Sequence, residues 1–486
     1  MHPPALTFHL GTAGALAPFA VFLSGVTALA LRGAPDERGF WPVLLGALIV
    51  GLLLAKDRTR YAEAMLDGMS QRIVMIMLCA WLFSGVLGSL LNASGFVGAL
   101  AWSAKAIGLS GGAYVVAAFI ACAIISTATG TSFGTILVAG PLLYPAGGAA
   151  GAAPAALIGA ILAGATWGDS MSPVSDTTIA SSGSQGADIG GTVRARLKYA
   201  VPAGLIALVA SYALGGSGMA SARVSAAAIA STAAQAGTAA GTIAGTAVGD
   251  APQAARALVM LAVPLIVIGL LLAKRHLLEA LLYGILATTV LGLVTGLLAP
   301  SQLLRVEPGA FGATGVVVDG FGRAIGVSVF TLLLMALVGT IQATDLLARL
   351  VAFAATRART AAGAEWWIVG TVSAAVMLTT HSVVAVLMTG PFASETGERH
   401  GLNPYRRANL LDLTVCTWPF LLPWFLPTIL AATTTRDAGA LGMPALGPLT
   451  VGMHNTYAWA LVATVVGMVV TGYGRHGVVT ARDHSG

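Results

Sequence analysis

One stretch of this sequence combines acids, hydroxyls, glycine and proline at a spacing that could bind a small cation. Residues 167–178 read WGDSMSPVSDTT, and Asp169 and Asp176 lie about two helical turns apart if the helix continues. Pro173 lacks an amide hydrogen, so we expect the helix to break between Gly168 and Pro173 and to free backbone carbonyls. Carboxylate, hydroxyl and carbonyl oxygens are hard ligands that suit small cations.

Burial would give such a carboxylate two competing ligands. Desolvation disfavours the charged form of an acid, so a buried aspartate binds a proton more readily than an exposed one. One aspartate can then hold either a cation or a proton, which is the simplest physical basis of cation/proton exchange. We predict this role for Asp169, which lies closest to the preceding apolar run. The alternative is that an acid caps the helix that follows, and this alternative stays open for Asp176.

A second polar cluster interrupts an upstream apolar run. Residues 126–135 read STATGTSFGT, in which hydroxyl residues are interspersed with glycines. Such residues fit the tip of a hairpin whose backbone faces a cavity, and we expect the hydroxyls of Thr131 and Ser132 to assist cation binding. The alternative is a packing face, because small residues are common where membrane helices meet.

The downstream half carries a histidine and a lone acid in comparable surroundings. His381, within the TTHS stretch 379–382, is either a hydrogen-bonded packing residue or a proton carrier at a hairpin tip. Asp412 is an isolated carboxylate in an apolar run, which makes it a candidate for cation or proton binding. The alternative for Asp412 is an ion pair with Arg406 or Arg407, about one or two helical turns away.

The composition of the whole chain places these clusters in a membrane. The 486 residues are 57% hydrophobic and 9% charged, against about 25% charged in soluble domains. We therefore predict an all-α polytopic membrane protein. Apolar runs are expected to span, in part with breaks, at 14–31, 40–55, 73–92, 113–143, 154–180, 199–215, 255–273, 277–298, 325–342, 366–392, 408–431 and 457–473. Polar or Pro/Gly clusters interrupt three of these runs, 113–143, 154–180 and 408–431.

The chain divides into two halves that resemble one another. An N-terminal transmembrane half, 1–215, is followed by an Ala/Gly/Ser/Thr-rich stretch, 216–254, which we predict to be a flexible linker, and by a C-terminal transmembrane half, 255–486. GTILVAGP at 134–141 corresponds to VAVLMTGP at 384–391, and each continues through a proline to Thr-Trp at nearly the same spacing. Such a pattern is typical of a two-repeat transporter that binds its substrate between the repeats.

Basic residues give the orientation of these halves. All Arg and Lys clusters face the cytoplasm if 113–143 and 366–392 are re-entrant hairpins, and several change sides if both are full spans. The hairpin arrangement makes the two repeats inverted, with one hairpin entering from each side. We therefore predict inverted repeats with broken transmembrane helices. The clusters considered are 56–72, 194–198, 274–275, 349–359 and 399–407.

Other functional classes lack support in the sequence. The three cysteines, Cys79, Cys122 and Cys416, lie in or beside apolar runs and predict neither a disulfide framework nor a zinc site. No Walker A or H-E-x-x-H pattern occurs, so we expect neither an enzyme nor an ATP-driven pump. The net charge of +6 does not indicate nucleic acid. We expect no cofactor beyond transported Na⁺ and H⁺, lipid as the surroundings, and a homodimer as an assembly to be tested.

At residues 168–178, GDSMSPVSDTT resembles the G-D-x-x-S-P-x-S-D-T-T signature of NhaC-type sodium/proton antiporters. TGTSFGT at 129–135 is similar to that family's T-G-T-S-x-G-T. The resemblance covers residues from about 70 to 473 and implies the inverted repeats, hairpins and alternating access of the wider ion-transporter superfamily. It also implies that Asp169, Ser172, Asp176 and Thr177 line or support the cation site, with Asp169 and Asp176 as the acids toward Na⁺.

The second half departs from the family's pattern. The family carries an acidic pair, a T-x-T-S-P stretch and then P-W-N, whereas this chain has one acid in Leu411-Asp412, then Thr417-Trp418-Pro419, and Pro423-Trp424-Phe425 without the asparagine. His381 stands near a position where the family tends to carry an amide.

These observations lead to one leading prediction and two rivals. We predict a Na⁺/H⁺ antiporter of a bacterial inner membrane. A cation-coupled carrier of an organic acid or amino acid is the first rival, because half-helix N-termini at the breaks could hold a carboxylate. A channel or a membrane scaffold is the second, and it has less need of paired acids at broken helices.

Overall fold

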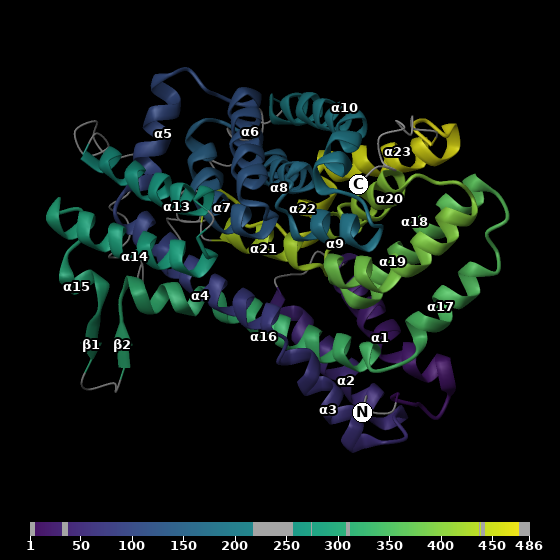
Figure 1. The fold of residues 1–486 in the computed structure, drawn as a ribbon. Helices are drawn as coiled ribbons and strands as arrows, with labels where there is room; N and C mark the ends of the chain where they lie inside the picture. Colours follow the sequence, from purple (N-terminus) through teal and green to yellow (C-terminus); the bar gives the residue numbers. More distant parts are fainter. Residues whose placement is uncertain are drawn as a thin grey trace.

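The computed structural model describes residues 5–31, 37–216, 256–273, 275–307, 312–436, 438 and 443–475. The predicted linker at 216–254 falls almost wholly outside these residues. The two strands of the described part are β1 (Arg305–Glu307) and β2 (Gly312–Thr314), an antiparallel pair in which Arg305 lies opposite Thr314, and its other regular elements are helices. Figure 1 shows this pair at one end of the molecule, beside α15 (Pro300–Leu303).

Seven described helices contain a stretch long and apolar enough to cross a membrane. They are α1 (Gly11–Leu31), α4 (Arg72–Ala93), α6 (Gly112–Thr129), α10 (Ile189–Gly216), α14 (Leu277–Val294), α16 (Val316–Gln342) and α18 (Ala361–Thr379). Shorter apolar helices are α2 (Trp41–Leu54), α13 (Ala262–Leu272), which follows the 3-10 turn η2 (Leu258–Leu261), and α23 (Thr456–Thr471). The prediction of an all-α polytopic membrane protein is confirmed.

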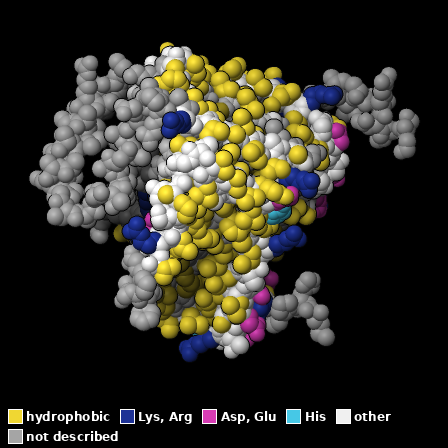
Figure 2. Space-filling model, turned by 90° about the vertical axis from the view of Figure 1, so that its left-hand side faces the viewer, with side chains coloured by type: hydrophobic (Ala, Val, Ile, Leu, Met, Phe, Trp, Pro, Cys, Tyr) yellow, Lys and Arg dark blue, Asp and Glu magenta, His cyan; other side chains and the backbone are white. Residues whose placement is uncertain are grey.

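The surface of the protein is apolar where lipid would cover it. Figure 2 shows a face covered mostly by hydrophobic side chains, with the Lys, Arg, Asp and Glu side chains gathered toward its margins. Leu205, Ile206 and Val209 of α10 and Leu286 and Val290 of α14 are among the exposed large hydrophobic residues. Acyl chains solvate such side chains as well as a protein core does, so their exposure costs little in a bilayer.

The first two predicted interruptions are breaks between helices. Helix α6 ends at Thr129 and α7 (Ser132–Ala149) begins at Ser132, with Gly130 in the left-handed conformation at a φ of 69°. A side chain at position 130 would be strained, and its Cβ would lie 2.8 Å from the carbonyl oxygen of Val174. The helix α8 (Pro154–Met171) and the helix α9 (Asp176–Ser184) are separated by residues 172–175. The two breaks therefore pack against each other.

The downstream half repeats this geometry. Between α18 and α19 (Ser382–Arg399), Thr380 is left-handed and His381 is extended, at φ −134° and ψ 116°, close to the −144° and 116° of Thr131. The helix α20 (Pro404–Val415), the 3-10 turn η4 (Trp418–Phe420) and the helix α21 (Leu426–Arg436) follow. The predicted interruption of 408–431 is thus confirmed as a break in the helix.

Thr380 is the one non-glycine residue of the described chain with a positive φ, at 51°. A left-handed conformation costs an L-residue about 1–2 kcal/mol, and a β-branched residue is a clear outlier there. The buried Thr380 hydroxyl also has no hydrogen-bond partner among the described residues.

We expect Thr380→Gly to raise the free energy of unfolding by about 1 kcal/mol after the added chain entropy of glycine is deducted. Thermal melting in detergent measures the change. The matched control is Thr379→Gly, one residue earlier in α18, which should destabilise because it removes the Thr379 hydroxyl bond to the Ala375 carbonyl. Equal loss of stability in both variants would contradict the assigned strain.

Several short elements have no counterpart among the predicted apolar runs. They are η1 (Glu37–Phe40), α3 (Arg58–Met69), α5 (Phe96–Ala106), α17 (Leu346–Ala355) and α22 (Pro448–Met453). The basic link between the second and third runs is the helix α3, whose N-terminus is capped by Asp57 through the backbone amide of Arg60. Its Gly68 lies against the backbone of Gly339 in α16, where a Cβ would be 2.8 Å from the Gly339 Cα.

Helix α8 lies at the centre of the helical packing and carries the first aspartate of the site. It contacts α6, α7, α10, α21, α22 and α23, and Figure 1 shows α6, α7, α10 and α22 around it. A Cβ on Gly168 would lie 2.3 Å from the carbonyl oxygen of Ala123 in α6. Only glycine allows this approach, which holds the last turn of α8 against α6.

Candidate ion-binding site

A cavity of about 280 Å³ lies where four helix breaks meet. It is lined by the α6–α7 break, the α8–α9 break, the α18–α19 break, the start of α4 and the segment around η4. Six of the eight predicted site residues line it: Thr131, Ser132, Asp169, Asp176, Thr177 and His381. Ser172 and Asp412 are not part of its lining.

Asp169 is held by the start of the neighbouring helix. It occupies the last turn of α8 with 8% of its surface exposed. The Ser132 hydroxyl donates a hydrogen bond of 2.8 Å to its Oδ2. Thr131 caps α7, because its hydroxyl accepts a bond from the Gly134 amide at 3.2 Å. One carboxylate oxygen is therefore oriented by a serine at a helix N-terminus, where the helix dipole also favours negative charge.

The α8–α9 break supplies further oxygens. The Ser175 and Thr177 hydroxyls are 3.1 Å apart, and both side chains line the cavity. Asp176 is exposed and is the first residue of α9, whereas Ser175 is the residue in the capping position. The capping interpretation is therefore wrong for Asp176, and it is wrong for Asp169, which lies near the end of a helix.

Ser172 holds the break itself. It is the C-cap residue of α8 and is buried, and its hydroxyl accepts a 3.3 Å bond from the Val174 amide. Its side chain thus stabilises the turn that places Ser175 and Asp176 in the cavity.

His381 faces the same cavity from the downstream half. It occupies the capping position of α19, where no side-chain cap bond forms. Its buried Nδ1 has no hydrogen-bond partner among the described residues, which does not favour the packing alternative. The following Ser382 hydroxyl donates to the Val415 carbonyl at 3.2 Å, which ties α19 to the end of α20.

Asp412 is paired, but the predicted partners are wrong. It forms a salt bridge with Arg196 of α10, and neither side chain is exposed. Arg406 instead contacts Glu365 at 2.8 Å, together with Arg475 at 2.8 Å, and Arg407 contacts Glu398 at 3.2 Å. The Asp412 carboxylate therefore has a built-in counter-charge from the other half of the chain.

Arg196 organises the polar groups directly behind the cavity. Its Nε donates to the Asn409 side chain at 2.8 Å, and one terminal nitrogen donates to the Thr178 hydroxyl at 2.8 Å and to the carbonyl of Ser170. The Thr178 hydroxyl in turn donates to Asp412 at 3.1 Å. A buried positive charge thus connects the residue after Asp169, the α9 helix and α20.

The sequence pattern did not single out Arg196, because it lies in the basic cluster 194–198 that served as a topology signal. A signal does exist: Thr192, Arg196, Tyr199, Ala200 and Ala203 are all buried in α10 and recur at helical spacing. An arginine on a stripe of small and aromatic residues is therefore an indication of a buried charge.

The donor set of the cavity favours a weakly held cation of the alkali type. Among the described residues, no three His, Cys, Asp or Glu side chains converge as they would around a tightly bound metal ion. The cavity offers instead two carboxylates, several hydroxyls, and walls formed by Met77, Phe133 and Leu137. Hydroxyl and carboxylate oxygens are hard ligands that suit such an ion.

Helix breaks around a buried carboxylate, inside a polytopic helical membrane protein, are typical of secondary ion transporters. Residues 6–216 match the sequence model of the Na⁺/H⁺ antiporter family. The resemblance predicted from residues 129–135 and 168–178 is confirmed.

Three individual proteins are similar to segments of this chain. The Na⁺/H⁺ antiporter NhaC of Alkalihalophilus pseudofirmus is 31% identical over 186 residues, 35% of this chain and 38% of that protein. The NhaC protein of Bacillus subtilis is 33% identical over 150 residues, 31% of each chain. The malate-2H⁺/Na⁺-lactate antiporter of Bacillus subtilis is 40% identical over 96 residues, 20% of each chain. The aligned segments cover at most 38% of these relatives.

Proposed function

We propose that this protein exchanges Na⁺ for H⁺ across a bacterial inner membrane, with Asp169 as the residue that binds either ion. The observation that carries the proposal is the buried Asp169 carboxylate, oriented by Ser132 in a cavity lined by hydroxyls and a second acid. The family match of residues 6–216 and the two NhaC relatives support the same ions.

The cavity supplies the groups that would let Na⁺ and H⁺ bind Asp169 in turn. Asp169 accepts a bond from the Ser132 hydroxyl, and the Ser175 hydroxyl and the Ser132 backbone also interact with its carboxylate. A cation bound there would take further oxygens from Thr131, Ser175 or Thr177, while Asp176 adds negative charge at the edge of the cavity. A proton satisfies the same carboxylate without these oxygens, because desolvation favours the neutral acid. Binding of one ion therefore excludes the other.

Asp412 has a positioning role in this proposal. Its charge is balanced by Arg196, so it has little need of a transported cation. Removing either partner would leave an unpaired buried charge, whereas the intact pair fixes α9 and α20 relative to the end of α8. His381 remains a candidate proton carrier, since its Nδ1 faces no described partner.

Two inverted repeats are part of the proposal. Gly130, Thr131, Ser132 and Pro154 each have a counterpart 250 positions later in Thr380, His381, Ser382 and Pro404. The matching backbone angles at the two breaks, and the 18 residues of both α7 and α19, support a common origin. We infer that both helix pairs are re-entrant hairpins and that the ion binds between the repeats.

Proton flux in liposomes tests the function. We expect a Na⁺ gradient to drive H⁺ movement in the opposite direction, and the Na⁺ concentration at half-maximal rate to rise as the pH falls. The sign follows from competition, because a protonated Asp169 must lose its proton before Na⁺ binds. For one competing proton the increase approaches about tenfold per pH unit below the titration range of the carboxyl.

The controls separate this function from its rivals. Counterflow of labelled malate or lactate, without H⁺ movement in Na⁺ alone, would indicate the organic-acid carrier and contradict Na⁺/H⁺ exchange. A flux that does not saturate with Na⁺ and is not coupled to H⁺ would indicate a channel. The NhaC relatives do not favour either outcome.

A further inference from the structure

A second cavity lies close to the Asp169 cavity, and residues of α4 line both. This second cavity, of about 180 Å³, lies toward the C-terminal end of α4 and is lined by Ser84, Asn92 and residues of α7, α16 and α21. Trp81 and Leu137 line both cavities, with 3% and 6% of their surfaces exposed. These two side chains therefore form the wall between the cavities.

We propose that Trp81 and Leu137 are a gate between the two cavities, held shut by a hydrogen bond from Ser84 to the Leu137 carbonyl. The proposal rests on the proposed transport function for the identity of the ion that passes. The gate itself is a claim about access, which is measurable without transport.

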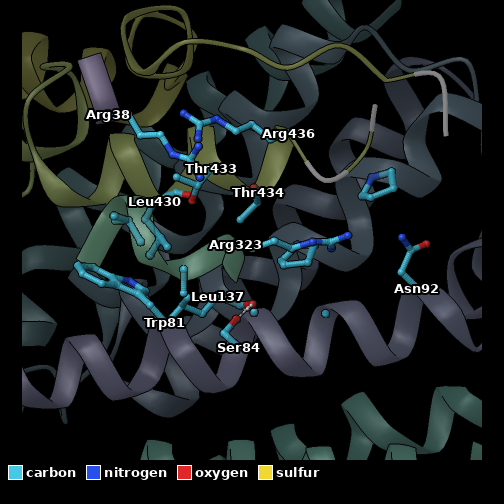
Figure 3. A pocket seen from close by; sticks show the side chains of 16 residues that line it. Arg38, Trp81, Ser84, Asn92, Leu137, Arg323, Leu430, Thr433, Thr434 and Arg436 are labelled. Atoms are coloured by element: carbon cyan, nitrogen blue, oxygen red, sulfur yellow. Dashed lines mark hydrogen bonds between the residues drawn. The ribbon is translucent and has the colours of Figure 1, made fainter. Parts of the chain in front are cut away.

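The hydrogen bond that closes the gate exists because of a proline. In a regular helix the Leu137 carbonyl would accept from the amide four residues later, but that residue is Pro141, which has no amide hydrogen. The Ser84 hydroxyl, on α4, donates to this carbonyl at 2.9 Å instead. Figure 3 shows this bond beside Trp81, on the side of the second cavity opposite Arg38 and Arg436. The link thus joins α4 to α7 at the wall.

The surroundings of this bond allow α7 to move. Pro141 and Pro145 both lie inside α7, and prolines weaken a helix where they remove backbone bonds. On α4 the neighbouring contact is made by Gly88, where a Cβ would lie 3.6 Å from Pro141, an ordinary contact distance. The Ser84 bond is thus the specific polar link between α4 and α7 at this point.

The two cavities differ in what they can bind. Asp169 and Asp176 line only the first, and none of the residues that line the second is acidic. The second cavity contributes hydroxyl and amide groups from Ser84, Asn92 and Thr433, which suit water. It is also lined by Arg38, Arg323 and Arg436, whose positive charges disfavour a resident cation. We therefore assign the second cavity the role of a passage for the ion. When the gate is shut, an ion reaches Asp169 only through the Asp169 cavity. When the gate is open, it reaches Asp169 through either cavity.

Thiol labelling in the full-length protein tests the gate. Cys79, Cys122 and Cys416 are replaced, and single cysteines are introduced as Met77→Cys in the Asp169 cavity and Asn92→Cys in the second cavity. A charged, membrane-impermeant thiol reagent is applied from each side of proteoliposomes. We expect Asn92→Cys to react from one side and Met77→Cys to be protected from that side.

Gate variants should remove this protection. We expect Trp81→Ala to bring the labelling rate of Met77→Cys, from the side that reaches Asn92→Cys, to the rate of Asn92→Cys itself. Ser84→Ala should raise it about fivefold, the population shift that follows from losing one net hydrogen bond. Ser89→Ala is the matched control, since Ser89 is a buried serine of the same helix whose hydroxyl has no partner among the described residues.

Two results would overturn the proposal. One is equal labelling of Met77→Cys and Asn92→Cys from the same side with Trp81 and Ser84 intact. The other is unchanged protection in Trp81→Ala or, if that variant does not fold, in Leu137→Ala. Gated labelling in a protein that shows no Na⁺/H⁺ exchange would refute the proposed function and leave the gate standing.

Discussion

Asp169→Asn is expected to reduce Na⁺-driven proton movement to the level of liposomes that lack the protein. An amide has the shape of the carboxylate and can still accept from Ser132, but it carries no charge to hold Na⁺ and does not bind a proton at working pH. The fold should survive, because a neutral group replaces a buried charge-bearing one.

A binding measurement makes this result specific. Na⁺ that binds the folded protein stabilises it, by about 2.7 kcal/mol at a concentration one hundred times the dissociation constant. We expect Na⁺ to raise the melting temperature of the wild-type protein and to leave that of Asp169→Asn unchanged. Asp67→Asn, at an exposed carboxylate of α3, is the matched control and should keep both flux and stabilisation. Retained coupling in Asp169→Asn would refute the assignment of this residue.

The second large effect is expected from Arg196. Arg196→Met should lower the free energy of unfolding by about 3–5 kcal/mol, because it leaves Asp412 as an uncompensated buried charge. Thermal melting and the yield of folded protein measure the loss. Arg194→Met is the matched control, since Arg194 lies on the same helix with its side chain exposed, and little change is expected there.

A double-mutant cycle separates the pair from the other bonds of Arg196. Arg196→Met combined with Asp412→Leu should be more stable than Arg196→Met alone, because the unpaired acid is gone. The bonds of Arg196 to Asn409 and Ser170 are still lost, so the recovery will be partial. If the two single changes simply add, the salt bridge does not carry the coupling that we assign to it.

The sequence was sufficient to predict the helix breaks at the site, but not which distant side chains pair there. Pro and Gly clusters predicted breaks within 126–135 and between Gly168 and Pro173, and the structure has them at 130–131 and 172–175. The prediction was possible because proline and left-handed glycine act on the local backbone. The pairing of Asp412 with Arg196 could not be read in this way, since it depends on how α10 and α20 pack. Arg406 and Arg407 were nearer in sequence, yet their helix directs them to Glu365 and Glu398.

The same limit applies to the gate. Trp81 and Leu137 are ordinary apolar residues of membrane helices, and nothing in their types suggests that they separate two cavities. Ser84 is informative only once the carbonyl that Pro141 leaves unbonded lies opposite it. Local signals therefore indicated the candidate ligands, whereas long-range packing determined which groups face them.

The Arg196 salt bridge also bears on how the chain enters the membrane during synthesis. Asn409, which neighbours Asp412 in this network, follows Arg196 by 213 residues, so α10 is made long before its partners. An unpaired arginine opposes insertion by about 2.5–3.5 kcal/mol at the centre of a membrane helix, and by less at Arg196, which is nearer the N-terminus of α10. The apolar remainder of α10 must outweigh this penalty until α20 arrives. In a ribosome-bound fragment that ends after α10, this helix should therefore be less stably inserted in the bilayer than in the completed protein.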